Sequence, residues 1–205
     1  MARKKRAIFK PASYAMPVSP KTVIVVTDGD GKARRAIELA AKKLGMYVVT
    51  CSAGSPTRAH PEDVEREIAE ADGELIVVMA DDGGQVGEGA GERLIKVLSE
   101  HGLLNAVVAA ASDTPGVTKI EVKESVTVDG RTTARAVDKA GRKKRSKMLA
   151  GDTAEGAAGL HVPVIGIGDP GKVGVDKKGA RAMERALREA VVLGKRMRPT
   201  PPTQA

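Results

Sequence analysis

Short runs of branched apolar residues alternate along this chain with segments of helical periodicity. The first run, Thr22–Thr27 (TVIVVT), suits a strand that is buried on both faces of a sheet. The next segment, 32–44, has apolar residues at the three- and four-residue spacing of a helix and ends at Gly45. An alternation of this kind is typical of helices layered on a parallel sheet.

The pattern continues almost to the end of the chain. Strands are predicted at 22–27, 46–52, 75–80, 106–111 and 162–167, and helices at 32–44, 61–71, 92–100 and 181–195. The segment 118–137 alternates at period two around an Asp129-Gly130 turn signal, which predicts an inserted β-ribbon. We therefore expect a three-layer Rossmann-like or flavodoxin-like α/β fold with about five mostly parallel strands.

Length and composition predict three parts. The 205 residues suffice for one α/β domain, which we place at 21–197, with the ribbon and a basic loop at 118–150. Residues 1–20 and 198–205 are proline-containing and are predicted to be a flexible basic leader and a flexible tail.

We find neither the apolar core of a secretory signal nor the ~20 apolar residues of a membrane-spanning helix. The single cysteine, Cys51, excludes an internal disulfide and is expected in the core.

The positive charge is concentrated in a few segments. The chain has 34 Lys and Arg against 26 Asp and Glu, a formal charge of +8. The leader, the run 139–147 and the segment 195–198 together carry +14, so the other residues carry −6. We expect the basic segments to contact a partner protein or an anionic lipid surface. The candidate contact residues are Arg3, Lys4, Lys5, Arg6, Arg142, Lys143, Lys144 and Arg145.

This charge distribution argues against nucleic acid as the partner. Only 1% of the residues are aromatic, which leaves almost no side chains on which bases could stack. The acidic remainder of the chain would repel phosphates beyond the basic segments. The chain is therefore not expected to bind DNA or RNA.

Carboxylates follow several of the predicted strands. The carboxyl ends of parallel strands meet at one edge of a sheet, so these groups should lie close together. Clustered carboxylates repel one another unless they are protonated or bridged by a cation, which predicts a Ca²⁺ or Mg²⁺ site. If a metal is present, Asp28, Asp81 and Asp82 would hold it. Aspartate is also the ordinary capping residue after a strand, and this alternative stays open. The candidate set is Asp28, Asp30, Asp81, Asp82, Asp169 and Lys172.

The same residues permit two enzymatic hypotheses. One is a divalent-cation-dependent phosphotransferase or phosphohydrolase centred on the aspartates. The other is a receiver-like domain, with acids after the first and third strands, Ser112 after the fourth and Lys172 after the fifth. A nucleoside triphosphatase is not supported: Gly166–Lys172 (GIGDPGK) has P-loop spacing, but Val173 replaces the required Ser or Thr.

Motifs between residues 22 and 176 resemble the stage V sporulation protein AE family of endospore-forming bacteria, and more narrowly its soluble AEa-type members. They depart from the family pattern at Ser55, where Asn is expected, at Gly83, where Cys is expected, and at Pro170, where Ile is expected. The basic leader and the RKKR loop look like additions to that pattern. The motifs are VIVVTDGD, ARRAIELAAKKLG, SAGSPT, VVMADDGGQVGEGAGE, AAASDT, VDKAG, GDTAEG and VPVIGIGDPGKV.

The resemblance implies a non-enzymatic component of the spore inner-membrane machinery, which takes up calcium dipicolinate in sporulation and releases it in germination. It implies peripheral attachment to that membrane. The expected partners are other stage V sporulation A proteins and integral spore-membrane proteins, and a homo-oligomer stays open. It provides no catalytic residues and no certain cofactor.

Overall fold

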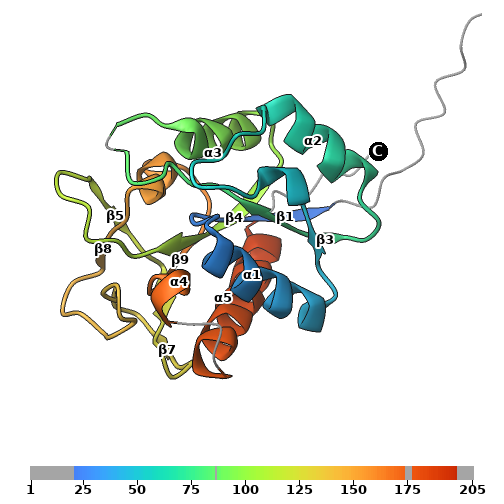
Figure 1. The fold of residues 1–205 in the computed structure, drawn as a ribbon. Coiled ribbons are helices and arrows are strands. Elements are labelled where there is room, and N and C mark those ends of the chain that lie inside the picture. Colours follow the sequence, from blue (N-terminus) through green and yellow to red (C-terminus); the bar gives the residue numbers. More distant parts are fainter. Residues whose placement is uncertain (1–20, 86, 174–176, 198–205) are drawn as a thin grey trace, which may run out of the picture.

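The computed structural model describes residues 21–85, 87–173 and 177–197 and has helices on both faces of a central sheet (Figure 1). The leader and tail predictions, including those for Arg3, Lys4, Lys5 and Arg6, fall outside these residues. The sheet has the order β2-β3-β1-β4-β9-β6-β7. Its strands are β1 (Thr22–Val26), β2 (Tyr47–Val48), β3 (Leu75–Met79), β4 (Leu104–Ala110), β6 (Glu124–Val126), β7 (Thr132–Thr133) and β9 (Val164–Ile167).

A second, two-stranded sheet and the helices complete the described chain. The small sheet pairs β5 (Lys119–Glu121) with β8 (Met148–Ala150) in antiparallel fashion. The helices are α1 (Gly31–Leu44), α2 (Pro61–Glu70), α3 (Ala90–Glu100), α4 (Pro170–Val173) and α5 (Lys177–Arg196), with 3₁₀ turns η1 (Thr50–Ser52) and η2 (Thr153–Ala157).

The expected α/β class and mostly parallel sheet are confirmed. Six strands of the large sheet run parallel, and β7 is an antiparallel edge strand. Strand β1 is central, with β3 on one side and β4 on the other. All five of its residues are buried, which accounts for the uninterrupted apolar run in the sequence.

Alternate residues of β1 supply two separate cores. Ile24 and Val26 pack in the core that contains residues of α1 and α5, whereas Val23 and Val25 pack in the core that contains residues of α2 and α3. Helices α1 and α5 lie side by side on their face of the sheet (Figure 1). The helical periodicity and the β-branched runs thus have one cause, burial against a sheet that is covered on both sides.

The expected ribbon near 118–137 forms as the hairpin of β6 and β7, but the segment as a whole is divided between the two sheets. Strand β6 lies beside β9 in the main sheet and parallel to it, while β5 pairs with the distant β8. Only β6 and β7 form the expected hairpin, with Gly130 at φ 80° in its turn. Period-two alternation indicates an extended strand but carries no information about which strand will be its partner.

The predicted second strand, 46–52, is shorter than expected. Only Tyr47–Val48 pair with β3, and η1 follows. The Glu67 carboxylate accepts hydrogen bonds from the backbone N–H groups of Thr50 (2.7 Å) and Cys51 (3.1 Å), which stabilises the turn. Cys51 is consequently exposed, so its expected place in the core was wrong, while Ser52 is buried.

Gly166 is a strand residue in β9, paired with Ala109 and Ser125, so the P-loop spacing has no structural counterpart. A Cβ at this position would lie 2.3 Å from Ser125 Oγ and 2.8 Å from Leu149 Cδ1. The glycine therefore permits close packing of two sheets.

We predict that Gly166→Ala lowers the free energy of unfolding by about 1–3 kcal/mol, because the added methyl group overpacks the core. Gly31→Ala is the matched control, since a Cβ there has no neighbour within 4 Å. Denaturant unfolding should show a lower midpoint for Gly166→Ala only; equal midpoints for both variants would contradict the packing explanation.

Candidate functional site

The carboxyl edge of the sheet brings Asp28 and Asp81 close together. Strands β1 and β3 are paired up to Val26 and Met79, so the residues that follow them are neighbours. Asp81 is buried and uses both carboxylate oxygens as backbone acceptors. Oδ2 accepts from the Gly29 N–H at 3.1 Å and Oδ1 from the Gly83 N–H at 2.7 Å.

The loop 52–57 packs between these two strand ends. The Gly54 N–H donates to the Gly29 carbonyl (3.0 Å), and the Thr57 N–H donates to the Asp81 carbonyl (2.8 Å). The Asp81 N–H in turn donates to Thr57 Oγ1 at 2.9 Å. A Cβ on Gly29 would lie 2.6 Å from the Gly54 carbonyl oxygen, so glycine is needed for this close approach.

Asp82 is directed to a different part of the edge. Its Oδ1 accepts from the N–H groups of Gly91 (2.7 Å) and Glu92 (3.4 Å) at the start of α3. Its own N–H donates to Thr153 Oγ1 at 3.0 Å. The structure therefore joins Asp81 to the loop after β1, and joins Asp82 to α3 and η2.

Asp30 and Asp169 border a hollow of about 380 Å³ that Lys172 also lines. Asp30 caps α1 by accepting from two backbone N–H groups at 2.8 Å. Asp169 accepts from the Lys172 N–H at 3.0 Å and so holds the start of α4. A Cβ on Gly171 would lie 3.1 Å from Asp169 Oδ1 and 3.2 Å from Asp30 Oδ2, so both carboxylates face this glycine.

We call the part of the carboxyl edge that carries Asp28, Asp30, Asp81, Asp82 and Asp169 the acidic edge. Lys139 supplies a cation to this edge, which the sequence reasoning missed. Its Nζ lies 3.7 Å from Asp169 Oδ2, and its carbonyl accepts from the Asp169 N–H at 2.9 Å. In the sequence, Lys139 is only one member of the basic run 139–147. A separation of thirty residues gave no signal that it would reach Asp169.

Thr57, Thr153 and Glu92 were also missed. The two threonines occur in the motifs SAGSPT and GDTAEG, but a threonine near glycine in a turn carries no signal of its partner. Glu92 was assigned only to a helix. It is buried and, like Asp82, has one carboxylate oxygen without a hydrogen-bond partner among the described residues.

Burial weakens the negative charge of this edge. It raises the pKa of Asp28 to about 8; the hydrogen bond from the Asp30 N–H opposes this, and the nearby carboxylates of Asp30, Asp81 and Asp169 add to it. Burial also raises the pKa of Asp82, and it raises that of Glu92 to about 7 with a contribution from Asp82.

Within the part of the chain that the structure describes, no three or more His, Cys, Asp or Glu side chains are grouped so that they could hold a metal ion. The carboxylates of Asp30, Asp81, Asp82 and Asp169 serve as acceptors for backbone N–H groups. Ser112, the hydroxyl of the receiver-like hypothesis, accepts from the Asp152 N–H at 3.2 Å. The clearest chemical capacity of the edge is thus to fix the geometry of several loops.

The basic loop is an ordered surface feature. Arg142, Lys143 and Arg145 are exposed and Lys144 is half-buried. The Lys144 N–H donates to the Ala136 carbonyl, and the Arg142 N–H donates to Asp138 Oδ1, both at 2.8 Å. The loop thus presents several cations on a backbone that is held in place.

We predict that Asp28→Asn makes stability less dependent on pH. In the unfolded chain Asp28 ionises near its ordinary pKa of 3.8, whereas in the folded chain it ionises near 8. The unfolded state therefore binds fewer protons between these values, and the Asp28 contribution favours folding less as pH rises from about 4 to 8. Asparagine remains neutral and can still accept from the Asp30 N–H.

Thermal unfolding from pH 4 to 9 tests this. The melting temperature of Asp28→Asn should rise relative to that of the parent between pH 4 and 8, by about 2–4 °C for each kcal/mol recovered, and level off above. Asp113→Asn, at an exposed position after β4, is the control. A difference between Asp28→Asn and the parent that stays constant over this range would contradict the assignment.

Three comparisons with known proteins bear on the identity of the chain. Searches of curated proteins and of solved structures gave no match. No helix among residues 21–85, 87–173 and 177–197 is long and apolar enough to cross a membrane. The model of one family, described as stage V sporulation protein AE1, matches residues 22–193, which include both cores and the acidic edge. The chain therefore belongs to the stage V sporulation protein AE1 family.

Proposed function

We propose that this protein is a non-enzymatic, peripheral component of the spore inner-membrane machinery that moves calcium dipicolinate, taken up in sporulation and released in germination. Family membership carries the proposal, because it gives the protein a role in sporulation. The expected partners are other stage V sporulation A proteins and integral spore-membrane proteins.

The structure supports an assembly role through the way its acidic edge is used. Asp81 and Asp82 each accept two backbone N–H groups, and Asp30 accepts two more. A carboxylate in this arrangement holds a fixed loop, and fixed loops favour recognition by a partner because little conformational entropy is lost on binding. The exposed cations of the basic loop give such a partner, or anionic lipid, a charged surface to contact.

Membrane association in spores tests the proposal. We expect the full chain to co-purify with spore inner membranes and to be released by high salt, because screening weakens contacts between exposed charges. The triple variant Arg142→Gln/Lys143→Gln/Arg145→Gln should be recovered mainly in the soluble fraction. A chain lacking residues 1–20 measures the contribution of the leader.

The matched control removes the same number of charges elsewhere. Arg35, Lys42 and Arg93 are exposed, so their triple Gln variant should stay with the membrane. Recovery of the parent chain in the soluble fraction at low salt would refute peripheral attachment. Equal loss of both triple variants would show that only total charge matters.

A second candidate, divalent-cation-dependent phosphoryl chemistry or a receiver-like domain, is favoured by one observation. Asp28 faces the negative charges of Asp30, Asp81 and Asp169, and a bound Ca²⁺ or Mg²⁺ would offset their repulsion. Lys172 lines the hollow that Asp30 and Asp169 border, and its amine could hold a phosphate.

Calorimetric titration with Ca²⁺ and Mg²⁺ decides between this candidate and capping aspartates. A cation site would release the Asp28 proton near pH 7, so the binding heat would change with the ionisation enthalpy of the buffer. We expect neither ion to bind saturably to the parent or to Asp81→Asn, and no turnover of generic phosphate esters. Saturable binding that Asp81→Asn abolishes would favour the second candidate.

A further inference from the structure

The start of β1 and the end of α5 meet at the edge where the parallel strands begin, which we call the amino edge. Asn105, the second residue of β4, contacts both of them. Its Oδ1 accepts from the Val23 N–H at 2.7 Å, and a Cβ on Gly194 would lie 3.0 Å from its carbonyl oxygen. Two segments from opposite ends of the sequence are therefore neighbours at this edge.

Lys21 fixes the point at which the basic leader joins the fold. Its amine donates to the carbonyls of Ile68, Ala69 and Ala71 at 2.6, 2.7 and 2.8 Å, at the end of α2. The last carbonyls of a helix lack donors within the helix, so a lysine is well placed there. Residues 1–20 directly precede Lys21 and contain five Lys and Arg residues and no acid. The charge of the leader is thus tethered to the amino edge.

The end of α5 adds cations and apolar side chains at the same edge. Val192, Lys195 and Arg196 are exposed, and their three- and four-residue spacing places them on one face of the helix. A backbone hydrogen bond of 3.2 Å from Met197 to the preceding turn continues the helix. The side chain of Met197 is 55% exposed and that of Val192 is 39% exposed. Positive and apolar groups thus alternate on this end of α5.

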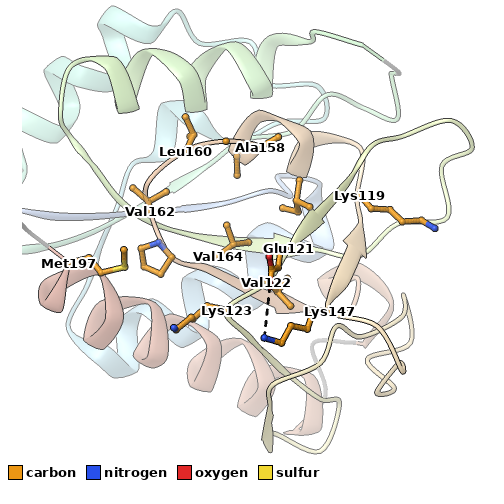
Figure 2. A pocket seen from close by; sticks show the side chains of 14 residues that line it. Lys119, Glu121, Val122, Lys123, Lys147, Ala158, Leu160, Val162, Val164 and Met197 are labelled. Carbon is orange, nitrogen blue, oxygen red and sulfur yellow. Dashed lines mark ion pairs between the residues drawn. The ribbon is translucent and has the colours of Figure 1, made fainter.

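Lys123 brings a further cation to the amino edge. Lys123 and Met197 line the same pocket at the amino ends of β6 and β9 (Figure 2). None of the ion pairs among the described residues involves Lys123, Lys195 or Arg196. These three exposed cations are therefore available to an anionic partner.

Acidic residues limit the basic surface on its other side. Glu70, Asp72 and Glu74 are exposed at the end of α2 and just before β3. A negatively charged partner would repel these side chains. The α5 side of the amino edge, rather than its α2 side, is therefore the part that such a partner would contact.

The basic loop begins at the opposite edge of the sheet. The Lys139 carbonyl accepts from the Asp169 N–H just beyond the carboxyl end of β9, and the Gly141 carbonyl accepts from the Val128 N–H beyond that of β6. A flat surface that contacts the end of α5 is therefore not expected to contact Arg142 at the same time.

We propose that the α5 side of the amino edge docks on an anionic lipid bilayer. Lys123, Lys195 and Arg196 contact lipid phosphates, and Val192 and Met197 reach the apolar region beneath the headgroups. The cations of the leader add to the attraction. Exposed apolar side chains flanked by cations suit a surface in which negative headgroups cover hydrocarbon. The inference rests on the proposed function, since it names the surface through which a peripheral protein attaches.

Sedimentation of the purified full chain with lipid vesicles tests this. Vesicles of phosphatidylcholine with about one quarter phosphatidylglycerol should bind the chain, and vesicles of phosphatidylcholine alone should not. Lys195→Gln/Arg196→Gln should weaken binding roughly 20- to 30-fold, because each cation near an anionic surface contributes about fivefold. Arg35→Gln/Arg93→Gln is the matched control and should bind as the parent does. It removes two exposed charges near the starts of α1 and α3, at the opposite edge.

A second pair of variants tests the position of the bilayer. Met197 is largely exposed, so its substitution carries little risk to the fold. Met197→Gln removes the apolar contact, and Met197→Glu has a similar size but adds a charge that the lipid repels. Both should weaken vesicle binding, and Met197→Glu should weaken it more. Equal binding by the two variants would contradict a bilayer at this position.

Three further results would overturn the inference. They are vesicle binding by Lys195→Gln/Arg196→Gln that equals that of the parent, equal loss for the control variant, and a greater loss for Arg142→Gln/Lys143→Gln/Arg145→Gln. A chain that co-purifies with spore membranes but binds no vesicles also overturns it and leaves the proposed function standing, because a membrane protein would then hold the chain. Vesicle binding by a chain that is soluble in spore extracts would support this surface and refute the proposed function.

Discussion

Backbone N–H groups just beyond the carboxyl ends of the parallel strands need hydrogen-bond acceptors. Much of the structure depends on which side chains of this chain supply those acceptors. Leaving such a group buried without an acceptor costs about as much as a lost hydrogen bond. Asp81 accepts from the loop after β1 and from its own loop, and Asp82 accepts from the first turn of α3. Thr57 and Thr153 hold the backbone N–H groups of these two aspartates. The loops are thus connected to one another through side chains as well as through the chain itself.

These hydrogen bonds change how the negative charge of the acidic edge is interpreted. Four carboxylates close together would repel one another in water, yet here several accept charge-assisted hydrogen bonds, and burial raises the pKa of Asp28 to about 8. Lys139 offsets part of the charge on Asp169. At neutral pH, therefore, this edge is less negative than its formal charges suggest, and much of the polarity of the molecule comes from the exposed cations of the basic loop and the end of α5.

The sequence was informative where burial imposes a repeating pattern. The runs at Thr22–Thr27 and 75–80 and the helical periodicity at 32–44 predicted β1, β3 and α1 closely, because each buries residues at fixed spacing. It was less informative where a partner decides the outcome. The period-two segment after residue 118 divides between two sheets, and the Glu67 carboxylate converts an expected strand into a 3₁₀ turn. For the site, the sequence predicted which residues follow the strands, but it did not show that Asp81 and Asp82 would turn to different loops.

The place of β6 in the main sheet has a consequence for how the region 118–150 is regarded. A module that is merely appended to a sheet can be removed without exposing the edge of any strand in that sheet. Here β6 covers one side of β9 along Ile165–Ile167, and Lys139 pairs with Asp169 just beyond that strand. Excision would turn β9 into an unprotected sheet edge, which is prone to pair with other chains, and would leave Asp169 without this cation. A shortened form of this chain would therefore need a replacement strand beside β9.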